Sequence, residues 1–133
     1  MDLERGQPSV DAWGIRPPPV YRLRLGEAPT RAPLLVLEGE FDMAAAEEVR
    51  ARLAELAGAG VASVVLDLTA VTFIDSSTLR ELLRADLLLR SSGGRLVLAA
   101  PTPPVTRLLE LTRATELLIV VDSLPEAFRH SAA

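Results

Sequence analysis

Apolar and polar positions change their spacing along the chain, and the spacing predicts five strands. Positions 20–25 alternate apolar residues with arginines, as in a strand that exposes one face. The segments 34–38 and 63–68 are almost continuously apolar, which is typical of strands covered on both faces. Two further apolar runs, at 95–99 and 117–121, predict the remaining strands.

Helical spacing of apolar residues separates most of these strands. Asp42 is placed as the N-cap of a helix that begins with Met43, and a leucine-rich segment at 79–90 predicts a second helix. Pro103 is suited to the first position of a short third helix. Ser123, followed three residues later by a glutamate, forms a capping box for a terminal helix.

The order ββαβαβαβα predicts the α/β fold class. Helices that alternate with strands join parallel neighbours by right-handed crossovers, whereas the first two strands are expected to form a hairpin. We therefore predict one domain at 20–133 with a mixed, mostly parallel sheet. Residues 1–19 are rich in proline, show no periodicity, and are predicted to be a disordered tail. Trp13 in this tail either packs loosely, folds back or docks on a partner.

Charge and composition argue against several classes of protein. The net charge is −4 without a basic stripe, so we predict that no nucleic acid is bound. The chain has no cysteine, which excludes disulfides and thiolate zinc sites. The polar N-terminus and the short apolar runs predict a cytoplasmic protein that does not insert into a membrane.

Side-chain sets that support catalysis or nucleotide binding are missing from the sequence. The one histidine, His130, stands near the C-terminus, far along the chain from the serines at 76–77 that a triad would need. There is no lysine for a phosphate-binding loop and no glycine-rich dinucleotide motif after a strand. We predict a protein that is not an enzyme and that has no cofactor and no metal site.

The strongest candidate site is the segment Asp75-Ser76-Ser77-Thr78. It lies where a buried strand leads into the leucine-rich helix, and unpaired N–H groups at a helix N-terminus favour anions. Such a site accepts a phosphate well. The same residues are also preferred N-caps, each worth about 0.5–2 kcal/mol over alanine, so capping alone explains them too.

Three motifs in this order resemble the STAS domain, above all that of bacterial anti-sigma factor antagonists. The motifs are Gly39-Glu40-Phe41-Asp42, Val65-Leu66-Asp67-Leu68 and Phe73-Ile74-Asp75-Ser76-Ser77. The resemblance covers roughly residues 20–130 and implies helices mainly on one side of the sheet. It also implies partner switching without catalysis. An unphosphorylated antagonist of this family binds an anti-sigma factor serine kinase, is released when phosphorylated, and is restored by a phosphatase.

The resemblance also assigns roles to individual residues. Ser77 matches the phosphate-accepting serine, with Ser76 and Thr78 as rivals. Family members usually have glycine where Thr78 stands, so the alternative hypothesis is an unphosphorylated STAS scaffold subunit of a larger signalling or transporter assembly. The sequence leaves open whether the protein forms a homo-oligomer. The expected partner-binding residues are Asp42, Asp75, Ser76, Ser77, Thr78, Arg80 and Arg84.

Overall fold

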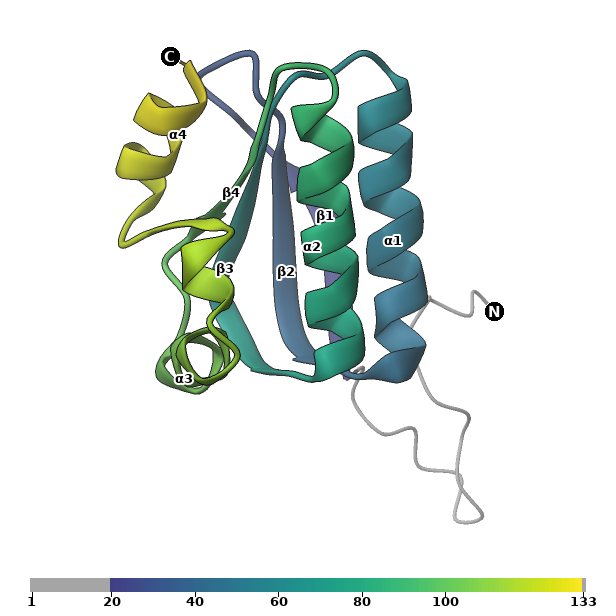
Figure 1. The fold of residues 1–133 in the computed structure, drawn as a ribbon, viewed down its shortest axis with the longest axis vertical. Helices are drawn as coiled ribbons and strands as arrows, with labels where there is room; N and C mark the ends of the chain where they lie inside the picture. The colour runs from purple at the N-terminus through teal and green to yellow at the C-terminus, as the bar shows by residue number, and fades with distance from the viewer. Residues whose placement is uncertain (1–19, 133) are drawn as a thin grey trace.

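A five-stranded sheet organises the part of the chain that the computed structural model describes, residues 20–132 (Figure 1). The strands lie side by side in chain order, and the first pair is antiparallel while all the others are parallel. The strands are β1 (Tyr21–Gly26), β2 (Leu34–Phe41), β3 (Val64–Ile74), β4 (Leu96–Ala99) and β5 (Ile119–Val121). The mixed, mostly parallel sheet predicted from the sequence is confirmed, whereas the predicted tail lies outside the described residues.

Helices cover both faces of this sheet unequally. Those described are α1 (Met43–Gly58), α2 (Ser76–Arg90), α3 (Pro103–Leu111) and α4 (Leu124–Ala132), with a 3₁₀ turn, η1 (Ala114–Glu116), before β5. The main apolar core lies between the sheet and the first three helices, of which α1 and α2 run side by side (Figure 1). A smaller core joins α4 to the other face. Helices mainly on one side are therefore confirmed.

The largest difference from the predicted elements is the length of β3. Apolar character predicts a strand at 63–68, but β3 continues to Ile74 because its second half pairs with β2 alone. Its last residue lies opposite Phe41, the last residue of β2. The helical spacing of apolar residues predicts a segment at 79–90, but α2 begins earlier, at Ser76. The two strands thus end together and start their helices at the same edge of the sheet.

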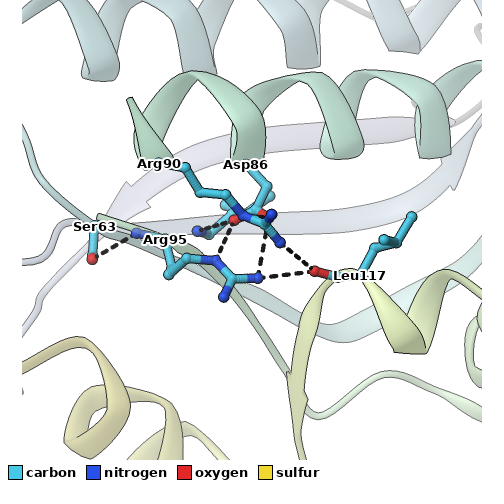
Figure 2. Close-up of polar contacts among 6 residues, drawn as sticks. Ser63, Asp86, Arg90, Arg95 and Leu117 are labelled. Atoms are coloured by element: carbon cyan, nitrogen blue, oxygen red, sulfur yellow. Dashed lines mark hydrogen bonds and ion pairs between the residues drawn. The ribbon is translucent and has the colours of Figure 1, made fainter. Parts of the chain in front are cut away.

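A buried carboxylate joins α2 to the start of β4 and, through two arginines, to the segment before β5 (Figure 2). The side chain of Asp86 is 4 % exposed and accepts hydrogen bonds from Arg95 at 3.0 and 3.2 Å and from the Leu96 amide at 2.9 Å. Arg90 pairs with the same carboxylate at 3.1 Å. Both arginines also donate to the carbonyl of Leu117, at 2.8 and 2.9 Å. This network fixes α2 against β4 and the segment before β5, and sequence analysis did not single it out.

Candidate functional site

The N-termini of α1 and α2 lie next to each other, directly beyond the ends of β2 and β3. The register that places Phe41 opposite Ile74 is extended by a hydrogen bond from the Asp75 amide to the Phe41 carbonyl, at 3.0 Å. Asp42 and Asp75, both with extended backbone, then cap the two helices. We call Asp42 together with residues 75–78 the paired helix starts.

Each cap is made by a carboxylate that accepts hydrogen bonds from the first turn of its helix. Asp42 accepts from the amides of Ala44 and Ala45 at 3.0 and 3.2 Å, which confirms its predicted role as an N-cap. The carboxylate of Asp75 accepts from the Thr78 amide at 3.0 Å and from the Ser77 hydroxyl at 2.6 Å. Asp75 therefore both caps α2 and orients the side chain of Ser77.

These contacts change the acidity of Asp75. Burial raises its pKa, but hydrogen bonds from the Ser77 hydroxyl and the Thr78 amide together outweigh burial, so the pKa lies below its ordinary value. The carboxylate is therefore ionised at neutral pH. An ionised acceptor makes a stronger hydrogen bond with the serine hydroxyl than a neutral one does.

We expect the lowered pKa of Asp75 to appear in acid unfolding. A carboxyl whose pKa is lower in the folded state adds stability that is complete above its unfolded pKa of about 3.9 and is lost as the pH falls through its folded pKa. Because asparagine also caps helices, Asp75→Asn isolates the effect of the charge. Urea unfolding at a series of pH values should show the gap between the parent and this variant narrowing below about pH 5.

The control for this measurement is Asp122→Asn, a change to an exposed carboxylate outside the site. A stability gap between the parent and Asp75→Asn that stays constant down to the acid transition would contradict the role given to the charge.

The three hydroxyls of the site differ in accessibility. Ser76 is exposed, Ser77 is half-buried, and Thr78 is fully buried. The Thr78 hydroxyl donates to the carbonyl of Phe41 at 3.1 Å, with the Asp42 carbonyl at 3.4 Å, so it ties the start of α2 to the end of β2. Its side chain fits without crowding the helix. This burial counts against the sequence-based interpretation of Thr78 as a rival acceptor and as a partner contact.

Arginine and apolar side chains surround the paired helix starts. Arg80 is exposed on α2, and Arg84, one turn further, is exposed and pairs with Glu81 at 3.2 Å. Met43, the first residue of α1, and Phe73, near the end of β3, are also exposed. Neither residue was predicted from the sequence to belong to the site, although Met43 directly follows the first STAS-like motif and Phe73 begins the third.

The structure does not bring His130 together with the serines at 76–77 as a catalytic triad would require. His130 is exposed on α4, which packs on the face of the sheet opposite α1 and α2, so it is remote from Ser77. Among residues 20–132, no group of three or more acidic, histidine or cysteine side chains is arranged to hold a metal ion. In the same range, no helix has the length and apolar character needed to cross a membrane.

Comparison with known proteins finds one matching family model and several solved structures with the same fold. The family model described as the STAS domain matches residues 27–127. An anti-sigma factor antagonist from Mycobacterium paratuberculosis superposes with a TM-score of 0.77 at 20 % identity, over 85 % of this chain and 95 % of that chain. A putative anti-sigma factor antagonist from Thermotoga maritima gives 0.73 at 23 % identity, over 84 % and 95 %. The phosphorylated form of the Bacillus cell fate determinant SpoIIAA gives 0.64 at 22 % identity, over 81 % and 97 %.

Proposed function

The chain belongs to the STAS domain family, and we propose that it is an anti-sigma factor antagonist that acts by partner switching. The fold that it shares with such antagonists is that of a non-enzymatic regulatory family. In the proposed cycle the unphosphorylated protein binds an anti-sigma factor that is a serine kinase. Phosphorylation of Ser77 releases it, and a phosphatase restores it.

The hydrogen bond between Ser77 and Asp75 is the observation that carries this proposal. The Ser77 hydroxyl is half-buried at the N-terminus of α2, 2.6 Å from an ionised carboxylate. That contact holds the hydroxyl in one orientation on the surface. Ser76 is more exposed but has no such contact among the hydrogen bonds of the described residues, and Thr78 is buried. Ser77 is therefore the hydroxyl that is both oriented and accessible.

A phosphate at Ser77 changes the surface more than the fold. It adds about −1.5 to −2 charges, which the N-terminus of α2 tolerates because of its unpaired N–H groups and macrodipole. The phosphorylated oxygen can no longer donate to Asp75, and the two negative groups repel each other. Inside an interface the same charge must be desolvated. Blocked docking then explains release without any refolding of this protein.

The partner surface follows from what surrounds Ser77. Met43 and Phe73 supply exposed apolar area. Charged and polar contacts come from residues of the paired helix starts and from the exposed side of α2 next to them. These contacts are Asp42, Ser76, Ser77, Arg80 and Arg84. Apolar anchors with a polar surround are the usual composition of a protein interface.

Phosphorylation by the kinases of the same organism tests the proposal directly. We expect incubation with ATP and the matching anti-sigma serine kinase to add one phosphate, which fragmentation mass spectrometry places on Ser77. Ser77→Ala should stay unmodified, and its neighbour Ser76→Ala should still receive the phosphate on Ser77. A phosphate on Ser76 would show that the site is wrong. If no such kinase modifies or binds the chain, the scaffold hypothesis replaces partner switching.

A further inference from the structure

A groove of about 200 Å³ runs between α1 and α2 and has no role in the proposed phosphorylation. Its walls come from both helices and combine apolar side chains with three charged ones. We call it the α1–α2 groove, and among its lining residues are Arg50, Leu53, Ala54, Glu81, Arg84 and Leu88. The volume suits a single large side chain better than a whole helix.

Glu81 lines this groove, and one of its carboxylate oxygens is buried beside it without a hydrogen bond. Its side chain is 12 % exposed, and its Oε2 pairs with Arg84 at 3.2 Å. Its Oε1 is buried and has no hydrogen-bond partner among the described residues. Native proteins rarely leave a buried carboxylate oxygen unpaired. The terminal torsion of glutamate is broad, so a modest rotation turns this oxygen toward a donor placed in the groove.

The other groove residues indicate what kind of donor fits. Leu53 and Leu88 offer apolar walls, and Arg50 and Arg84 also line the groove, each paired with a glutamate of its own helix. Guanidinium groups are attracted to the faces of aromatic rings, best of all to that of tryptophan. An indole ring also carries one N–H, which only donates, and so matches a carboxylate oxygen. A tryptophan side chain satisfies all three features at once.

We propose that Trp13, the single tryptophan of this chain, occupies the α1–α2 groove and directs its indole N–H toward Glu81. The described chain starts beside α1, because the hydroxyl of Tyr21 bonds to Glu48 of that helix at 3.0 Å. Seven residues, 14–20, lie between Trp13 and Tyr21, and they span roughly 22 Å when extended at about 3.1 Å each. A helix is about 10–12 Å across, so this length passes around α1 to the groove.

Fluorescence of the single tryptophan tests this proposal in the full chain. We expect emission at shorter wavelength, and weaker quenching by acrylamide, than in a peptide of residues 1–19 alone. Leu88→Ala removes a wall of the groove and should move both values most of the way to those of the peptide. The matched control is Leu87→Ala, the next residue of α2, which is 63 % exposed where Leu88 is 49 % and lines a different hollow near Leu117. This control should leave the fluorescence unchanged.

A second variant changes the wall of the groove that α1 forms. Ala54→Leu fills the groove from an exposed position of α1 and should expose Trp13 to acrylamide without removing any contact of the core. Parent fluorescence equal to that of the peptide would overturn the proposal. So would shielding that increases with protein concentration, because the tryptophan would then come from a second copy. Neither result bears on phosphorylation of Ser77, so failure here is distinct from failure of the proposed function.

Discussion

Ser77→Asp should fold like the parent protein and bind the proposed partner, an anti-sigma factor kinase, about 30- to several-thousand-fold more weakly. The aspartate places a negative charge at the N-terminus of α2, where the fold tolerates it, but next to Asp75 and inside the proposed interface. Losing the serine contact and desolvating a charge together correspond to roughly 2–5 kcal/mol. Calorimetric titration of the kinase in the presence of nucleotide measures this effect, and far-UV circular dichroism checks the fold.

Two neighbouring changes make this result specific. Ser76→Asp adds the same charge one residue earlier, on a side chain that is exposed, and should weaken binding less. Ser77→Ala should bind well and should not be released by ATP. Equal affinity of the parent and Ser77→Asp would place the interface elsewhere on the molecule, whatever the kinase assay reports.

Asp86→Ala should lower the free energy of unfolding by about 2–3 kcal/mol. The Leu96 amide, which is fully buried, loses its acceptor, and the link from α2 to β4 is broken (Figure 2). Arg90 and Arg95 are 41 % and 35 % exposed, so both can reach water when the carboxylate is removed. This keeps the loss below that of a fully buried ion pair. Urea unfolding followed by circular dichroism measures it.

Asp86→Asn is the graded variant of this experiment. Its amide oxygen can still accept from Leu96, so it should lose less stability than alanine does. Glu47→Ala breaks an exposed pair with Arg50 on α1 and should change stability hardly at all. A loss for Asp86→Ala as small as that for Glu47→Ala would mean that water replaces the carboxylate at Leu96.

Thr78 illustrates how a motif can mislead about exposure. The motif places a hydroxyl beside the acceptor serine, and the local sequence does not show whether that hydroxyl faces the surface or the interior. In the structure its side chain turns inward, because the ends of β2 and β3 bring the Phe41 carbonyl within 3.1 Å of its hydroxyl. A threonine that closes the gap between two helix starts has a structural role of its own.

Local spacing carries most of the information about the fold. The order of elements, the hairpin, the Asp42 cap and the Ser123 half of the predicted capping box all depend on residues close together in the chain, and all are confirmed. The full length of β3 could not be predicted in this way, since its second half is held by pairing with β2 rather than by a continuous apolar pattern.

The fold class, the family resemblance and the candidate site can be predicted from the amino-acid sequence alone, because helical and strand periodicity and motif spacing are local properties. Tertiary packing was needed to show which of the three adjacent hydroxyls is oriented and accessible, and that Asp86 accepts hydrogen bonds from Arg95 and from the Leu96 amide of β4. The same packing places Arg50 of α1 and Glu81 of α2 in the lining of one groove. Burial and hydrogen bonding depend on strand register and helix packing, and these join residues that are distant in the chain.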